Sequence, residues 1–276
     1  MKVKALSVMI LSLLPVFVTG QNGENLKNLS LKGHDKKSDR DVTFHRIMPF
    51  SDASGYFLAV RYDDSEVTER MVWNSLKDIE FYPENLEQFW QKEGLRTRIY
   101  ADLLRKGLRN DIRDIMEGYM ADYLASLDAK DLFVDNYLDS RLYEILRKVY
   151  PPGNMDGRRG VRNIIVVSNL TPDAWIGPDG TMVLTTAVFT ILTSEDEVLA
   201  LMAQEASHMF LDHQLDNFSR MINNLFDPDL SSIITFNLEQ EAEADNSAIE
   251  LLRYYGKDPG VLGAVLNKMK AYAERT

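Results

Sequence analysis

The stretch "SEDEVLALMAQEASHMFLDHQLDNF" (194–218) constrains the fold most, because it predicts a long helix with a defined beginning. Ser194 is a preferred N-cap residue, and Glu197 follows three positions later, which is the spacing of a capping box. The three acidic residues of the first turn also suit the positive end of the helix dipole. The segment "AQEASH" (203–208) therefore lies well inside regular helix.

This helix brings polar side chains together. Gln204 and His208 are four positions apart, so they lie about 40° apart around the helix and can converge on one ion. Glu205 lies beside both. Zinc-binding helices of metallopeptidases have the pattern His-Glu-x-x-His, in which the histidines bind zinc and the glutamate takes a proton from the metal-bound water. Here glutamine occupies the first position, so the pattern indicates either a metal site that lacks one imidazole or an ordinary helix.

A second polar helix follows in "NLEQEAEADNSAIELLRYYGKDPG" (237–260). Its apolar spacing predicts a helix over 238–255, which ends before the Gly256…Pro259 stop signal. Glu241 and Asp245 are four positions apart and hence on one face of that helix. Glu241 is the candidate third metal ligand. Asp245 is placed to accept a hydrogen bond from a ligand histidine.

Four other residues with metal-binding side chains are candidates to replace the missing imidazole. His213 lies five positions after His208, about 140° further round the helix, and is expected to point away from the site. His34 and His45 belong to the N-terminal region, and the sequence does not place them near the site. Asp212 is four positions after His208 and could share a shifted ion with it; the alternative is an exposed helix aspartate.

Residues from about 131 to 270 resemble the zinc metallopeptidases of the HtpX-like, CAAX-prenyl-protease-like and BepA-like groups, which include soluble periplasmic proteins. The resemblance rests on "DAWIGPDGTMVLTTAVFTILTSEDEVLALMAQEASHMFLDH" (173–213), "EAEAD" (241–245) and "GKDP" (256–259). These segments have the order and spacing of the family's own motifs, and they cover half of the chain. Gln204 is the one departure, since the family has histidine there.

The resemblance implies a mostly helical α+β fold of the zincin-like metallopeptidase kind, with a small sheet whose edge strand borders the active-site cleft. It implies that Glu205 is the general base, that His208 and Glu241 bind Zn²⁺, and that Asp245 supports a ligand. Gln204 would be a weak ligand in place of histidine. The cleft would be bordered by Trp175, Ile176, Gly177 and Gly180, and an extended peptide or unfolded protein would bind by adding a strand to the sheet edge.

The glutamine leaves three hypotheses open, because a neutral amide oxygen is a poor zinc ligand. The protein is a weakened zinc metalloendopeptidase that uses Gln204, His208 and Glu241, or a pseudopeptidase that binds peptides or proteins without useful turnover, or a scaffold with no function in the cleft. Retained carboxylates count against the last, because burying them is costly without an ion or hydrogen bonds. A glycosidase pair of Glu205 and Glu241 also stays open, although nothing else supports it.

The rest of the sequence predicts the domain bounds and a few further helices and strands. Residues 21–65 form a polar lead-in, partly flexible, with a strand in "GYFLAVRYDD" (55–64), and residues 66–276 form the metallopeptidase-like domain. Two or three amphipathic helices are expected from Pro83 to Leu127 and another over 131–150. Strands are expected at 163–169 and on both sides of the turn "GPDG" (177–180).

Composition and the N-terminus limit the location and the partners. The net charge of −11 argues against a nucleic-acid partner, and the absence of cysteine excludes disulfides and thiolate chemistry. Lys2, Lys4 and the apolar run "ALSVMILSLLPVFV" (5–18) predict a signal peptide over residues 1–20, cleaved before Gln21, and an exported protein in a periplasm or outside the cell. The apolar run is too short to span comfortably, so no membrane span is expected after cleavage.

Overall fold

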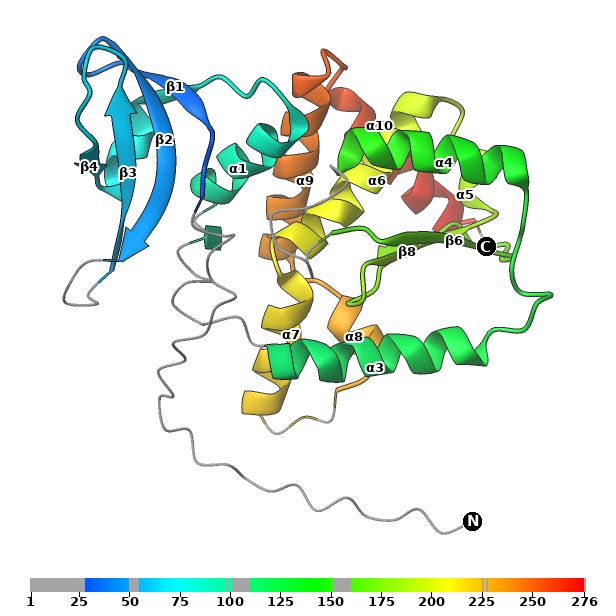
Figure 1. The fold of residues 1–276 in the computed structure, drawn as a ribbon. Coiled ribbons are helices and arrows are strands. Elements are labelled where there is room, and N and C mark those ends of the chain that lie inside the picture. The colour runs from blue at the N-terminus through cyan, green and yellow to red at the C-terminus, as the bar shows by residue number, and fades with distance from the viewer. Residues whose placement is uncertain are drawn as a thin grey trace.

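Two sheets and a set of helices make up the computed structural model, which describes residues 28–49, 55–97, 99–100, 110–150, 160–224, 226 and 228–275 (Figure 1). The expected signal peptide, residues 1–20, lies outside the described residues. Among the described helices, none is long and apolar enough to cross a membrane.

The first sheet is antiparallel and has five strands in the order β4-β3-β2-β1-β5. Its strands are β1 (Lys32–Asp35), β2 (Arg40–Pro49), β3 (Tyr56–Tyr62), β4 (Glu69–Met71) and β5 (Ile79–Phe81). Alternate residues of β2, among them Val42 and Phe44, lie in a core with Leu58 and Val60 of β3. This alternation of buried and solvent-facing positions is what a sheet with one covered face requires.

Part of the stretch predicted as a polar lead-in, residues 21–65, belongs to this sheet. The stretch contains β1, β2 and β3, and position 65 falls between β3 and β4, which pair with each other. This stretch has few apolar residues, but those few alternate along the strands and are buried together. The strand expected within 55–64 is confirmed as β3.

Most of the described helices lie around a second, smaller sheet, whereas the 3-10 helix that follows β4 packs against the core of the first sheet. The described helices are the 3-10 helix η3 (Trp73–Asp78) and the α-helices α1 (Leu86–Arg96), α3 (Asn110–Ser126), α4 (Asn136–Val149), α5 (Val188–Ile191), α6 (Glu195–Phe210), α7 (His213–Asn223), α8 (Leu230–Ile234), α9 (Leu238–Tyr254) and α10 (Gly260–Ala273). The amphipathic helices expected between residues 83 and 127 are confirmed by α1 and α3. The helix α4 begins later than expected, since Asp135 caps it and Leu132 before it forms a bridge with Val167.

The second sheet has the strand order β6-β8-β7, with β6 (Asn163–Val167), β7 (Ala174–Ile176) and β8 (Thr181–Thr185). β6 and β8 are parallel, and β7 and β8 form an antiparallel pair across the predicted "GPDG" turn. β7 is an edge strand next to α6. The expected α+β fold, mostly helical with a small sheet, is confirmed.

The helix α6 runs through the centre of this part, packed against α9, α4, α10 and β7 (Figure 1). Every residue from Leu199 to Phe210 is buried. Trp90 of α1 lies against Phe210, with 4.6 Å between ring centroids, and its indole N–H donates to the Val149 carbonyl of α4. A helix buried on all sides accepts polar side chains only where other polar groups satisfy them.

Candidate functional site

The helix α6 begins where its sequence predicts. The Ser194 side chain accepts a hydrogen bond from the Glu197 backbone N–H. In a capping box the Glu197 carboxylate would accept from the backbone N–H of the N-cap residue, Ser194. Here it accepts instead from the N–H of the preceding residue, Thr193, at 2.6 Å. This start sets the rotation of the helix, and with it the direction in which Gln204, Glu205 and His208 point.

These three side chains converge with Glu241 of α9. Gln204 is 5% exposed, and His208 is 1% exposed. The Gln204 amide nitrogen lies 3.0 Å from Glu241 Oε2 and 3.4 Å from His208 Nε2. His208 Nε2 and Glu241 Oε2 are 3.6 Å apart. The predicted convergence of α6 and α9 on one point is therefore present.

The position of His213 corrects the expectation that it points away. α6 ends at Phe210, and Asp212 adopts a left-handed backbone conformation with φ 63°. A new helix, α7, then begins at His213 and directs its ring back toward α6, so that His208 Nδ1 and His213 Nδ1 are 2.9 Å apart. The estimate of 140° assumed a continuous helix, which this sequence does not form.

Asp212 is neither an exposed helix aspartate nor a partner of His208 in binding an ion. It is buried, and both of its carboxylate oxygens accept from Arg113 Nη2 of α3, at 2.6 and 2.7 Å. This buried ion pair lies at the residue where α6 gives way to α7. It therefore holds the turn that delivers His213 to the site.

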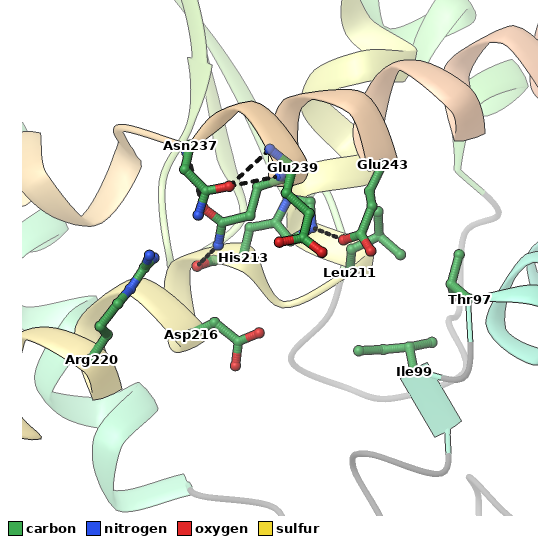
Figure 2. Close-up of a pocket in the computed structure, with 10 residues that line it drawn as sticks. Thr97, Ile99, Leu211, His213, Asp216, Arg220, Asn237, Glu239 and Glu243 are labelled. Atoms are coloured by element: carbon green, nitrogen blue, oxygen red, sulfur yellow. Dashed lines mark hydrogen bonds and ion pairs between the residues drawn. The ribbon is translucent and has the colours of Figure 1, made fainter.

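His213 continues the row of polar side chains formed by Gln204 and His208. It lines a cavity of about 300 Å³ (Figure 2). Its Nε2 lies 3.1 Å from Glu243 Oε2 on α9. Burial, with a smaller contribution from His208, lowers the pKa of His213 to about 3, while Asp212 acts in the opposite direction. His213 is therefore a neutral imidazole at neutral pH.

Phe236 is a further site residue that sequence reasoning missed. Its ring lies parallel to that of His208, with centroids 3.8 Å apart and an angle of 14° between the planes. Phe236 precedes α9 and comes to the site only because α9 packs on α6. A lone aromatic before a helix carries no sequence signal for such a role.

Asp245 does not make the predicted hydrogen bond to His208, because both nitrogens of His208 face other side chains. Within the described ranges, Asp245 Oδ1 is buried and has no hydrogen-bond partner. Burial and the neighbouring Glu241 raise the pKa of Asp245. His34 pairs with Asp41 within the first sheet, and His45 lies on β2 of that sheet, so neither belongs to an element that carries the site.

Glu205 is held against the edge of the second sheet. Its carboxyl group accepts a hydrogen bond from the backbone N–H of Ile176 on β7. Burial, followed by the charges of Glu241 and Asp173, raises the pKa of Glu205 well above its usual value. The surroundings of this buried carboxyl group thus disfavour its charged form, the form that accepts a proton.

The backbone N–H and C=O of Ile176, at the edge of β7, both have side-chain partners. Gly177 donates its N–H to Thr181, and Asp173 accepts from Thr185, so these alternate positions face β8. The N–H and C=O of Ile176 therefore point away from the sheet. The N–H is bonded to Glu205, and the C=O accepts from the Gln214 amide at 3.3 Å.

The other residues expected to border a cleft lie on β7 and its turn. Trp175 packs edge-on against Tyr123 of α3, with ring centroids 5.1 Å apart. Gly177 lies so close to Met120 of α3 that an added Cβ would be 2.7 Å from its sulfur. Gly180 is in the turn with φ 84°. The helix α3 thus covers part of the strand that was expected to receive a peptide.

The donor set does not fit a zinc ion. Zinc in proteins needs at least three protein ligands. His208 and Glu241 could share an ion, but the third group, Gln204, presents an amide nitrogen, which has no lone pair for a metal. No cluster of three or more His, Asp or Glu side chains suited to a metal occurs in the part of the chain that the structure describes.

Comparison with known proteins supports the family that the motifs suggest. Residues 137–227 match the model of peptidase family M48. The match includes α4, the second sheet and α6 with Glu205 and His208, and it supports a metallopeptidase-like protein. Peptidases of this family are generally zinc-dependent. No curated protein matches the chain.

Proposed function

We propose that this protein is an exported pseudopeptidase, which has the scaffold of an M48-like peptidase and binds extended segments of other polypeptides without hydrolysing them. Export follows from the signal-like residues 1–20 of the sequence. The proposal is the second of the three hypotheses that the sequence leaves open.

One observation argues against hydrolysis. Glu205, which has the position of the general base, is hydrogen-bonded to β7, the strand that would hold the substrate. A working site needs a carboxylate that accepts a proton from water and a free strand edge that holds the peptide. Here Glu205 accepts from the Ile176 N–H, and Gln214 donates to the Ile176 C=O. A peptide would have to displace both side chains before reaching this edge.

The opposite edge of the same sheet supports binding. Leu132 forms a bridge with Val167 of β6, while Phe133 donates its N–H to Val166 at 2.8 Å. The alternation of an antiparallel pair directs the backbone N–H and C=O of Leu132 away from β6. Within the described ranges neither group has a backbone partner. These groups can therefore pair with an added strand.

Large apolar side chains are exposed at this edge. Val134 is 76% exposed and Tyr137 is 77% exposed, and Leu132 and Phe133 beside them are also exposed. A group of exposed apolar residues marks an interaction surface. The segment "DAKDLFVDNYLD" (128–139) carries four Asp and one Lys. The partner that fits is an extended apolar segment flanked by Lys or Arg.

Hydrolysis is tested with the purified protein, an internally quenched peptide library and added zinc, beside a Glu205→Gln variant. We expect the two proteins to show the same background rate, with and without zinc. A zinc-dependent rate that Glu205→Gln abolishes would instead establish a weakened metalloendopeptidase and overturn the proposal.

Binding is tested by fluorescence anisotropy with a labelled peptide of alternating Val and Thr residues between lysines. We expect Val134→Asp to weaken binding by about tenfold or more. The matched control is Val67→Asp, since Val67 is 65% exposed but lies in the loop between β3 and β4 of the first sheet. Equal weakening by both variants, or no binding by the native protein, contradicts the assigned edge.

A further inference from the structure

We infer that Gln204 takes the place of a metal ion in this site. Its amide nitrogen lies between Glu241 Oε2, at 3.0 Å, and His208 Nε2, at 3.4 Å. These two atoms face each other at 3.6 Å, as two ligands of one small cation do. The amide group supplies two N–H donors at the point where a cation would supply positive charge.

The orientation of the Gln204 amide follows from its neighbours. A carboxylate oxygen only accepts hydrogen bonds, so Glu241 requires a donor opposite it. Turning the amide over would set the Gln204 carbonyl oxygen against Glu241 Oε2, two acceptors at hydrogen-bonding distance. The end of the side chain that could bind a metal is therefore directed away from Glu241.

The same amide determines which ring nitrogen carries the proton in each of the two imidazoles. A donor at Gln204 makes His208 Nε2 an acceptor, which places the His208 proton on Nδ1. That proton is donated to His213 Nδ1 at 2.9 Å, which leaves the His213 proton on Nε2. His213 Nε2 then donates to Glu243 Oε2 at 3.1 Å. The row from Gln204 to Glu243 is satisfied without a metal ion.

This arrangement explains why the polar residues remain although the zinc ligand set is incomplete. Buried polar groups are costly unless they are hydrogen-bonded. Glu241 has the Gln204 amide, and His208 has Gln204 on one side and His213 on the other. Phe236, stacked on His208, also limits rotation of the ring. A zinc ion would displace the amide and gain only two good ligands.

The inference is tested by zinc stoichiometry of the chelator-stripped and reloaded full chain. We expect the native protein to retain no zinc, Gln204→His to bind about one per chain, and Gln204→His with His208→Ala to lose it. The matched control is Gln91→His, which places histidine at another buried, hydrogen-bonded glutamine and should bind none. Native binding that His208→Ala abolishes overturns the inference, as does the failure of folded Gln204→His to bind zinc.

A second measurement does not depend on a new metal site. The chain has four histidines, so ¹⁵N-resolved spectra can assign the imidazole protons one by one. We expect His208 to carry its proton on Nδ1 and His213 on Nε2 in the native protein at neutral pH. The opposite pair of tautomers overturns the inferred direction of donation.

Thermal unfolding gives the stability effect of the amide. Gln204→Ala removes hydrogen bonds that include one to a charged acceptor, and we expect the Tm to fall by about 3–10 °C. An unchanged Tm contradicts a bridging role. The inference concerns only the metal and is separable from the proposed function: native zinc binding without peptide hydrolysis would overturn the former and leave the latter.

Discussion

The Nδ1 atoms of His208 and His213 lie 2.9 Å apart, although the two residues belong to different helices. The contact depends on Asp212, whose left-handed backbone separates α6 from α7. A non-glycine residue in this conformation costs of the order of 1 kcal/mol or more and needs support from its surroundings. Arg113 of α3, bound to both Asp212 oxygens, supplies it.

Replacing Arg113 tests this support. Arg113→Met leaves a buried carboxylate without its guanidinium, and we expect a loss of about 3–5 kcal/mol in the free energy of unfolding. Urea denaturation measures the change. Arg113→Met combined with Asp212→Gly should recover much of that loss, because glycine adopts the left-handed conformation freely. A loss below about 1 kcal/mol in the single variant would show that the ion pair does not hold the turn.

Acid destabilisation should depend on His213. Folding lowers its pKa from 6.5 to about 3, so the unfolded chain binds the proton more readily between these values. The stabilising contribution is complete above pH 6.5 and is lost as the pH falls toward 3, by about 1.4 kcal/mol per pH unit. His213→Gln should flatten this slope when unfolding is measured between pH 7 and about 4.

The control for this pH effect is His34→Gln. The hydrogen bond to Asp41 raises the pKa of His34, so its contribution is present at low pH and is lost as the pH rises through the folded pKa. His34→Gln should therefore not flatten the acid slope. If both variants flatten it equally, the acid sensitivity does not arise at the His208–His213 contact.

The bond between Glu205 and Ile176 is open to a backbone measurement. Glu205→Ala removes the acceptor, and we expect the Ile176 amide to exchange its hydrogen about five- to tenfold faster. Glu205→Gln keeps a carbonyl oxygen and should change the rate by less than about twofold. The Gly177 amide, bonded to Thr181, serves as the internal reference. Equal rates at Ile176 in all three proteins would refute the bond.

The turn after β7 should not tolerate a side chain at Gly180. Its φ is 84°, and an added Cβ would lie 2.3 Å from the Gly160 carbonyl oxygen. We expect Gly180→Ala to lower the free energy of unfolding by at least about 2 kcal/mol. Gly118→Ala, in the interior of α3 with open space around it, should instead stabilise by about 0.5–1 kcal/mol. Thermal unfolding of both variants decides the comparison.

Much of the helical part could be predicted because its signals are local. Ser194 and the acidic first turn mark the start of α6, and Asn237 caps α9 close to the predicted boundary. The four-residue spacing of Gln204 and His208 places them together in any regular helix. The "GPDG" turn likewise marks the β7–β8 hairpin.

The first sheet and the residues around His208 could not be predicted in this way. The strands β1 and β2 bury a few alternating residues in a largely polar stretch. Those residues share one buried face only because β1 and β2 pair with each other and with β5 and β3. Phe236 and Glu243 reach the two imidazoles because α9 packs on α6. These contacts join residues far apart in the chain.

The sequence by itself determined the two helices of the site, the absence of one imidazole at Gln204, and the resemblance to a metallopeptidase, since caps, periodicity and motif spacing act within a few residues. Only the tertiary structure decided that α6 breaks at Asp212, that the Gln204 amide nitrogen faces Glu241, and that Glu205 is bonded to β7. The physical reason is that a side chain's partners, and hence its protonation and orientation, are set by the groups that packing brings beside it.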